Sequence, residues 1–533
     1  MKYFHYILFV LILSCTLFIN CAKRGTITGG PKDTIAPVLL YTSPENYSIN
    51  FDEKTIKLTF DEYIKLDKIN QQLIISPPME YSPEITPMGF PNKTITIKLL
   101  DTLKQNTTYS INFGQSVVDN NEGNKYPNLR YVFSTGNYID SLKVRVRLKD
   151  AISKSINSFT KVMLYENENF NDSTIFKQKP LYVANSLDSL VDVTIENVKE
   201  GKYRLIAINE KNNNYKFDPN ADKIAFLNTV ISTPKDTVYN LVLFKEKKAA
   251  NFGRPNMLSK NKWLIAAEGN LKDVQIKVSD FKNDLKTAFY KVDKKDSLHV
   301  FVPDTSADSL KFEMQNKDFK KEFVIRTRSI KTLDSLRVDF LTSNTIEFND
   351  SIKLTGTTPI VKWDKNYFEL MKKDSTKIPF NILQDTLNNQ IKIDFEKEES
   401  TQYILSLLPG AVEDIFGKRN DSISSSFSTK EFAEYANLNI TVSHQETIPL
   451  ILELIDSKEK VIYRNLVGSN NSVSFFRIRP DKYFIRIIYD ENGNNTWDTG
   501  NYLMKLQPEK VFISDKFLDV RANWEMNENI ILP

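Results

Sequence analysis

Short runs in which apolar and polar residues alternate dominate the chain from about residue 35 onward. Three of them are T-I-K-L-T-F (55–60), T-I-T-I-K-L (94–99) and Y-S-I-N-F (109–113). A period of two places alternate side chains on opposite faces of a strand, and the Asn-, Asp-, Gly- and Pro-rich stretches between runs mark turns. Many short strands without a long amphipathic helix can bury their apolar faces only by stacking sheets. The sequence therefore predicts an all-β fold of tandem β-sandwich modules.

An internal duplication divides this strand-rich region. The segment G-K-Y-R-L-I-A-I-N-E-K-N-N-N-Y-K-F-D (201–218) aligns without gaps with D-K-Y-F-I-R-I-I-Y-D-E-N-G-N-N-T-W-D (481–498). A repeat of this length indicates two copies of one supersecondary unit. We expect the copies to span about 138–248 and 431–533.

A second, weaker repeat precedes each of these copies. I-K-L-T occurs twice, V-D-N-N-E-G (118–123) is echoed by V-E-D-I-F-G (412–417), and F-S-T closes both segments. These echoes predict a related pair of modules over 35–137 and 340–430. Between the two halves, residues 249–339 read as a further strand-rich β module.

The N-terminus carries a basic residue, Lys2, followed by an almost continuous apolar run over 3–19. This organisation is typical of a secretory signal, although the run approaches the length that spans a bilayer. A cysteine, Cys21, followed by polar residues favours a cleaved leader over an anchor. The sequence predicts a signal peptide over 1–20 and a flexible, glycine-containing tether over 21–34.

Two cysteines compete as the first residue of the mature chain. I-L-S-C, ending at Cys15, has the usual small residue before cysteine, whereas F-I-N-C, ending at Cys21, has Asn there. The run C-A-K-R-G-x-x-x-G-G-P-K-D resembles the mature start of a group of Bacteroidota lipoproteins and favours Cys21. That resemblance implies acyl chains such as palmitate on Cys21, with Cys15 as the alternative, and attachment to the outer membrane.

The side of the membrane stays open. Surface-exported lipoproteins of this group often carry an acidic run after the cysteine, whereas this chain has Lys23-Arg24, so a periplasmic and a cell-surface location are both retained. Either cysteine assignment leaves no cysteine pair in the mature modules. We therefore expect no intrachain disulfide there.

Residues 35–137 resemble the bacterial Ig-like domain family first described in surface-layer proteins. The motifs that carry the resemblance are A-P-V-L-L-Y-T-S-P-E-N (36–46), I-K-L-T-F-D-E-Y-I (56–64), L-I-I-S-P (73–77), L-K-Q-N-T-T-Y-S-I-N-F (103–113), V-D-N-N-E-G-N (118–124) and Y-V-F-S-T-G (131–136). Residues 340–430 look like a divergent second copy, in which G-T-T (356–358) replaces F-D-E. The duplicated units, 138–248 and 431–533, look like transthyretin-like or prealbumin-like sandwiches.

Oxygen-bearing side chains recur in the loop of each duplicated unit. The second loop has Asp490, Asn492, Asn494 and Asp498, and the first has Glu210, Asn212, Asn214 and Asp218, with Asp222 close behind. Calcium takes six to eight oxygen ligands, and this spacing offers several. Both loops lack the Gly and Glu that an EF-hand requires, and Asn and Asp also cap turns. Two interpretations remain: structural turns, or calcium sites, with the second loop the better candidate and no other cofactor expected.

Several functional classes find no support in the sequence. Only His299 and His444 remain outside the leader, and no nucleophile elbow, phosphate loop or zinc-protease motif occurs. The net charge is +4, so no global field favours nucleic acid. We expect a non-catalytic, lipid-anchored scaffold or interaction protein of the outer membrane with an envelope protein partner, as in an accessory subunit of a complex. The alternative is a surface lipoprotein that binds a ligand or glycan, with or without calcium.

Overall fold

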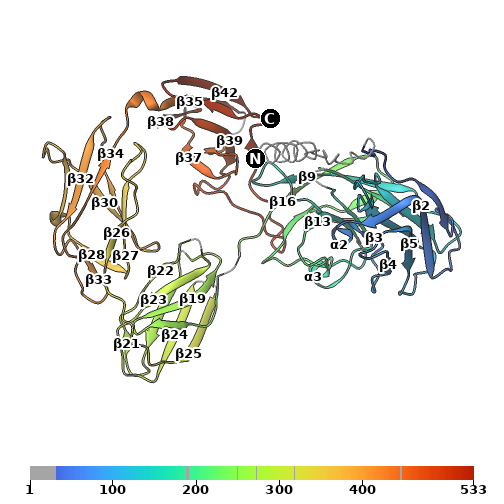
Figure 1. Cartoon of the computed structure of the whole chain (residues 1–533), viewed down its shortest axis with the longest axis horizontal. Coiled ribbons are helices and arrows are strands. Elements are labelled where there is room, and N and C mark those ends of the chain that lie inside the picture. Colours follow the sequence, from blue (N-terminus) through green and yellow to red (C-terminus); the bar gives the residue numbers. More distant parts are fainter. Residues whose placement is uncertain are drawn as a thin grey trace, which may run out of the picture. The chain divides into compact units, whose positions relative to one another are not determined.

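The computed structural model describes residues 32–187, 191–248, 250–271, 273–293, 295–316, 319–444 and 447–532. The chain divides into two compact units, Met1–Ser141 and Leu142–Pro533. Strands prevail throughout the described ranges (Figure 1). The helical elements found there are α2 (Ile69–Gln72), α3 (Thr174–Lys177) and the 3-10 turns η1 (Lys365–Tyr367) and η2 (Phe432–Glu434). The predicted all-β fold is confirmed.

The first unit is a two-sheet sandwich. One sheet has the order β1 (Leu39–Ser43), β2 (Thr55–Leu66), β5 (Asn92–Lys98), β4 (Glu84–Thr86), with β7 (Val117–Asp119) paired to β2. The other has the order β3 (Ile74–Ser76), β6 (Thr108–Gly114), β8 (Leu129–Ser134). The alternating runs thus become strands that are polar on one face and apolar on the other.

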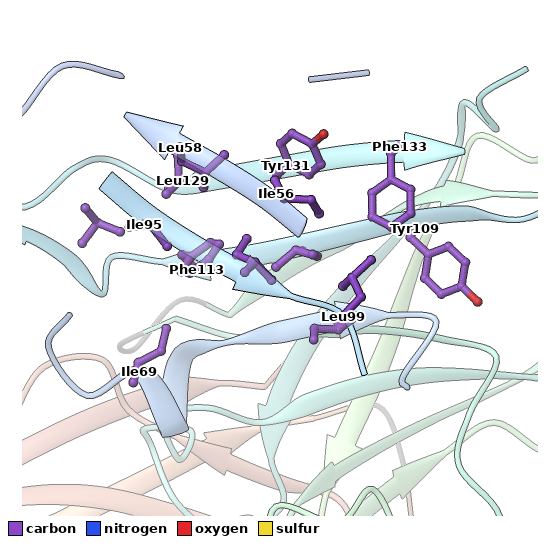
Figure 2. Packing of buried hydrophobic residues seen from close by; sticks show 14 of the residues in the cluster. Ile56, Leu58, Ile69, Ile95, Leu99, Tyr109, Phe113, Leu129, Tyr131 and Phe133 are labelled. Atoms are coloured by element: carbon purple, nitrogen blue, oxygen red, sulfur yellow. The ribbon is translucent and has the colours of Figure 1, made fainter. Parts of the chain in front are cut away.

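The core of the first unit lies between these sheets. Ile56 and Leu58 of β2 and Ile95 of β5 meet Tyr131 and Phe133 of β8, and all five are buried. Figure 2 shows these side chains filling the space between the strands. The two-residue period of the sequence therefore sets which side chains enter the core.

The second unit begins with the first repeat, residues 142–248. One sheet has the order β11 (Tyr182–Asn185), β10 (Lys161–Glu166), β13 (Gly201–Asn209), β14 (Lys223–Phe226), with β15 (Ile231–Thr233) paired to β13. The other has the order β12 (Asp192–Val198), β9 (Leu142–Asp150), β16 (Val238–Leu243), in which β16 runs parallel to β9.

The second repeat, residues 436–532, has the same topology. One sheet has the order β37 (Val461–Leu466), β36 (Leu450–Ile455), β39 (Asp481–Tyr489), β40 (Val511–Ile513), with β41 (Leu518–Val520) paired to β39. The other has the order β38 (Ser472–Ile478), β35 (Ala436–Ser443), β42 (Glu525–Ile531), again with its last strand parallel to β35 (Figure 1). Identical strand orders confirm the duplication.

Two further strand-rich modules lie between the repeats. In the first, β17 (Asn251–Phe252), β19 (Lys262–Glu268), β23 (Ser297–Phe301) and β22 (Ala288–Lys291) form one sheet with β18 (Asn256–Ser259) at its side, and β21 (Asp284–Leu285), β20 (Gln275–Ser279), β24 (Ser309–Asn316) and β25 (Phe319–Arg326) form the other. The second module has three sheets. One has the order β26 (Val338–Phe340), β27 (Ile352–Gly356), β31 (Gln390–Asp394), β30 (Asn381–Asp385), and another pairs β28 (Ile360–Trp363) with β33 (Val412–Asp414). The third has the order β29 (Phe368–Lys372), β32 (Gln402–Leu407), β34 (Ile423–Ser428).

This last module repeats the strand pairing of the first unit, with one interruption. The long strand β2 is replaced by the two strands β27 and β28, which pair with β31 and β33. Gly356 ends β27, and Pro359, which has no N–H to donate, precedes β28. The G-T-T-P segment therefore breaks the strand, while the rest of the sandwich is kept. After β28, the 3-10 turn η1 leads directly into β29.

Each predicted module range contains its own hydrophobic cluster, with members spanning Phe51–Phe133, Val144–Leu243, Ala250–Ile325, Val338–Phe427 and Ala436–Leu532. The module boundaries themselves stay a prediction. The predicted signal peptide, both candidate lipidation cysteines and nearly all of the tether lie outside the described residues. No helix of the described ranges is both long and apolar enough to cross a bilayer.

Candidate functional site

The first loop, residues 210–222, joins β13 to β14 and is built around Glu210. Its carboxylate accepts the backbone N–H of Asn214 at 2.8 Å and that of Tyr215 at 2.9 Å. Lys161 of β10 donates its ammonium to the same carboxylate at 2.5 Å. The two side chains are only 1% and 5% exposed. The loop thus contains a buried ion pair that closes it from within the repeat.

The ammonium of Lys161 has further partners in the loop. It donates to Oδ1 of Asn213 and lies 4.4 Å from the centre of the Tyr215 ring. Burial lowers the pKa of Lys161, and the charge of Glu210 opposes that shift. Burial and the nearby Glu210 raise the pKa of Tyr215 to about 12. A lysine therefore occupies the position beside Glu210 that a bound cation would take.

The other predicted ligands of the first loop cap its backbone. Asp222, almost fully buried, accepts the N–H of Asp218 at 2.8 Å, and burial raises its pKa. Asp218 accepts the N–H of Asn220 at 2.9 Å, and Asn214 accepts that of Lys216 at 2.8 Å. The remaining candidate, Asn212, is exposed.

The second loop, residues 490–510, joins β39 to β40 and has the same internal geometry. Asp490 is fully buried and accepts the N–H of Asn494 at 3.0 Å and of Asn495 at 2.8 Å. These are the fourth and fifth residues after the carboxylate, as in the first loop. Gly493 and Asn495 have φ of +68° and +61°, the left-handed conformation that Asn and Gly tolerate.

Glu509 closes the second loop as Asp222 closes the first. Its carboxylate accepts the N–H of Glu491 at 3.0 Å and that of Asp498 at 2.8 Å. Burial raises the pKa of Glu509, and the charges of Asp498 and Asp490 raise it further. The three carboxylates therefore lie near one another.

The two loops differ in the partners of Asp498. It accepts the side-chain amides of Asn492 at 2.7 Å and Asn494 at 2.5 Å. Its other oxygen accepts the ammonium of Lys247, which belongs to the first repeat. The hydrogen bond from Lys247 is the main cause that lowers the pKa of Asp498. The cation of this loop thus comes from the other repeat.

The second repeat has no counterpart of Lys161. Lys161 pairs with Ile208 in β13, and the residue that pairs with the equivalent Ile488 in β39 is Ile451. Ile451 packs with Ile488 and Val511 in a small cluster that also contacts Ile152 of the first repeat. An apolar contact between repeats therefore replaces the buried lysine.

The second loop also carries an insertion, residues 499–508. Three residues separate Asp218 from Asp222, whereas ten separate Asp498 from Glu509. Within the insertion, Tyr502 is 1% exposed, and its ring centre lies 5.3 Å from that of Phe226 of the first repeat.

Polar contacts fix the insertion on the first repeat. The Tyr502 N–H donates to Glu246 at 2.6 Å, and the Thr499 hydroxyl donates to the carbonyl of Lys245 at 2.7 Å. Gln507 donates to the carbonyl of Phe226 at 3.0 Å. The insertion is therefore one of the elements that attach the second repeat to the first.

A second set of contacts surrounds Ile152 at the end of β9. Arg486 donates to the carbonyl of Ile152 at 3.2 Å and forms a buried ion pair with Glu453 at 2.7 Å. Lys154 donates through its backbone to Glu459 at 2.9 Å. Apolar, hydrogen-bonded and ionic contacts together make this joint between the repeats the candidate site of the second unit.

The calcium hypothesis stays a prediction for both loops. No group of three or more His, Cys, Asp and Glu side chains suited to a metal is found in the described ranges. Apart from the exposed Asn212, the predicted ligands use their oxygens to accept loop N–H groups, side-chain amides or a lysine. The turn interpretation accounts for these bonds, and the loops' shared geometry follows from the duplication.

Sequence reasoning missed four residues of this site: Lys161, Lys247, Tyr502 and Glu509. A usable signal existed for the last two, because the gapless alignment of the repeats ends at Asp498 and the second loop then runs longer. No local signal marks the two lysines. They reach the loops only through strand pairing and the joint between repeats.

Two other acidic residues cap turns. Asp119 accepts the N–H groups of Glu122 at 2.6 Å and of Asn124 at 2.7 Å. Asp414, the last residue of β33, accepts the Lys418 N–H at 2.9 Å. Each carboxylate stabilises the turn that follows it.

Comparison with solved structures gives remote likenesses. The S-layer protein rSbsC is 12% identical, with 92% of this chain and 68% of that chain covered and a TM-score of 0.16. The major pilin subunit BcpA of Bacillus cereus is 9% identical, with coverages of 73% and 98% and a TM-score of 0.14. The I9–I11 tandem of titin is 8% identical, with coverages of 53% and 100% and a TM-score of 0.12. TM-scores this low carry no argument about arrangement or function.

Comparison with protein families is more specific. A search of curated proteins gives no match. The sequence pattern of the bacterial Ig-like domain family matches residues 33–135, which include both sheets of the first unit. Residues 33–135 therefore match the bacterial Ig-like domain family, as their motifs predicted.

Proposed function

We propose that this chain is a lipid-anchored, non-catalytic scaffold of the outer membrane whose β-sandwich modules dock an envelope protein. The observation that carries the proposal is a group of exposed apolar side chains on the Ig-like domain, here called the edge patch: Val38, Tyr63 and Phe90. They are 50%, 57% and 82% exposed. Gathered apolar side chains on a surface are typical of protein-interaction sites.

Contacts link Val38 to Tyr63, and Phe90 lies two residues before Asn92 of β5, which pairs with Ile64 next to Tyr63. Val38 and Asp61 exchange two hydrogen bonds, from the Val38 N–H to Oδ1 at 2.8 Å and from the Asp61 N–H to the Val38 carbonyl at 3.1 Å. Lys93 donates to the Asp61 carbonyl at 2.7 Å, and its ammonium lies 5.6 Å from the Tyr63 ring centre. The patch thus combines apolar surface with one adjacent cation, a composition suited to a protein partner.

The use of buried ionisable groups supports a structural role for the second unit. Its best-buried ion pairs, Lys161–Glu210 and Glu453–Arg486, close a loop and brace the joint between repeats. These groups are engaged in fixed bonds, so they are poorly placed to exchange protons with a substrate. The buried charges of the second unit therefore stabilise its modules, and this use of charge supports a structural role.

Site-specific photocrosslinking tests the proposed docking. A photoreactive residue replaces Phe90 in the full-length lipoprotein in native membranes, and Phe281, 60% exposed on another module, serves as the matched control. We expect one envelope protein to be crosslinked at Phe90 in near-stoichiometric yield and none at Phe281. Equal crosslinking at both positions, or none at Phe90, would contradict the proposal.

The lipid anchor has its own test. We expect Cys21→Ala to abolish acylation and to release the protein from the membrane fraction, because the acyl chains supply the membrane affinity. Cys15→Ala is the matched control and should leave acylation unchanged. Normal acylation of the Cys21→Ala protein with loss in the Cys15→Ala protein would move the assignment to Cys15.

A further inference from the structure

A cavity of about 360 Å³ lies where the insertion meets the first repeat. Its walls include Phe170, Arg204, Phe226 and Asn228 of the first repeat and Tyr502 and Lys505 of the insertion. The volume lies within the range of small-molecule pockets, and junctions between modules are common places for them. Because both repeats contribute, the cavity exists only while they are docked.

Arg204 supplies a cation to this cavity. Its Nε donates to Asn167 at 3.0 Å and its Nη1 to the carbonyl of Asn228 at 3.2 Å. A guanidinium carries five N–H donors, so these two bonds leave others unused. No ion pair between Arg204 and a carboxylate is found in the part of the chain that the structure describes. The neighbouring Lys505, by contrast, is paired with Asp172.

Tyr502 supplies an aromatic wall and an unmatched hydroxyl. Within the described residues its hydroxyl is buried without a hydrogen-bond partner. Burial raises the pKa of Tyr502, the charge of Asp172 adds to that shift, and the charge of Arg204 opposes it. Both charges therefore act on the hydroxyl, which lies close to two groups of the cavity wall. The hydroxyl itself is buried, so Tyr502 contributes its ring to the cavity.

From this arrangement we propose that the cavity binds a monovalent carboxylate carried on an aromatic or apolar body. The planar guanidinium of Arg204, with its remaining N–H donors, matches the two oxygens of a carboxylate. Phe170, Phe226 and the Tyr502 ring face the body of the ligand. The ligand is either a free organic acid or the C-terminal carboxylate of a peptide. This site is independent of the edge patch and of the proposed scaffold role.

Ligand-observed NMR titrations of the full-length protein test the class of ligand. The probes are phenylacetate, N-acetylphenylalanine and N-acetylphenylalanine amide, the last of which lacks the carboxylate. We expect saturable binding of an acid and at least about tenfold weaker binding of the amide, because a charge-assisted bond to the guanidinium is lost. Binding of phenylacetate indicates that the ligand is a free organic acid. Binding of N-acetylphenylalanine alone indicates that it is the C-terminal carboxylate of a peptide.

Variants assign the binding to the cavity. Arg204→Gln should weaken acid binding by about tenfold, whereas Arg204→Lys, which keeps the charge but loses the fork, should weaken it less. Arg521→Gln is the matched control, since Arg521 lies outside the cavity and pairs with Asp519. Unchanged hydrogen exchange in β13 and β14 verifies that each variant folds. Equal binding of acid and amide, unsaturable binding, or Arg204→Gln binding like the wild type would overturn the proposal.

Discussion

The first and second loops start from the same sequence pattern and end with different partners. In both, a buried carboxylate caps the N–H groups four and five residues later, through Glu210 in one and Asp490 in the other. The first loop takes its cation from Lys161 of its own sheet. The second takes Lys247 from the other repeat and adds an insertion that contacts it. The two copies therefore share the capping bonds of the loop and differ in the groups that the loop contacts.

This difference teaches how a repeated loop acquires a new role. Capping bonds run between neighbours in sequence, so they persist wherever the local pattern persists. The residue that neutralises the carboxylate comes from a distant strand, and its replacement by Ile451 leaves apolar surface for Ile152. The first loop is therefore neutralised by a lysine of its own repeat, whereas the second loop contacts the other repeat.

The largest expected effect comes from Lys161→Met. The variant leaves the Glu210 carboxylate buried without its cation, which typically costs about 3–5 kcal/mol. We expect much faster hydrogen exchange across residues 201–226 and an earlier first transition in chemical denaturation. Lys247→Met is the matched control, because that lysine is 63% exposed and its loss should cost about 1 kcal/mol or less. Equal effects of the two variants would break the comparison between the loops.

Removing the buried ring of the insertion should have the next largest effect. Tyr502→Ala takes away an aromatic side chain packed on Phe226, and a loss of about 3 kcal/mol from the joint is expected. Hydrogen exchange should rise in β14 and in residues 499–508, while the first loop stays protected. Leu503→Ala, at a residue 60% exposed, is the control and should change neither segment. Unaltered exchange in β14 after Tyr502→Ala would show that the insertion does not hold the joint.

Acid should weaken the second loop by a smaller amount. The folded-state pKa of Asp498 lies below the ordinary 3.8, so its stabilisation is present above pH 3.8 and is lost as pH falls through the folded pKa. Glu509 has a raised pKa and opposes this change, because its contribution is present below pH 4.5 and is lost as pH rises through its folded pKa.

Hydrogen exchange as a function of pH measures this acid response. Protection of residues 490–510 should decline below pH 3.8, and Asp498→Asn should remove most of that decline. In the first loop, burial raises the pKa of Asp222, so this carboxyl adds no loss of stability as the pH falls. A decline of the same size in residues 210–222 would contradict the difference between the loops.

Calcium should produce the smallest effect. At a concentration equal to its Kd, an ion stabilises the form that binds it by about 0.4 kcal/mol. We expect calcium to slow exchange in the second loop and to leave the first unchanged, because the Lys161 ammonium already lies on Glu210. Chelator reverses the effect in a matched sample. No response in either loop would remove calcium from the second loop, and a response in the first alone would reverse the comparison.

Local sequence patterns predicted much of the fold. Alternation in β2 and β5 placed Ile56, Leu58 and Ile95 in the core, because every second side chain of a strand lies on the same face. The alignment of Tyr203 with Tyr483 predicted two copies of one unit, and the strand orders agree. Both patterns depend only on residues close in sequence.

The candidate site could be predicted in part. The carboxylates Glu210 and Asp490 stand out because their capping partners follow within five residues. Lys161 lies 49 residues before Glu210, and Lys247 lies 251 residues before Asp498. Their positions depend on how strands pair and how repeats dock, and no short pattern encodes either.

The sequence by itself determined an all-β chain, a duplicated loop and a bacterial Ig-like domain, because strand period, turn residues and motif order are local properties. Tertiary structure alone decided that one loop holds its own lysine while the other joins two repeats around Tyr502. The physical reason is that a buried charge or ring is stabilised only by the groups that surround it, and folding draws those groups from distant parts of the chain.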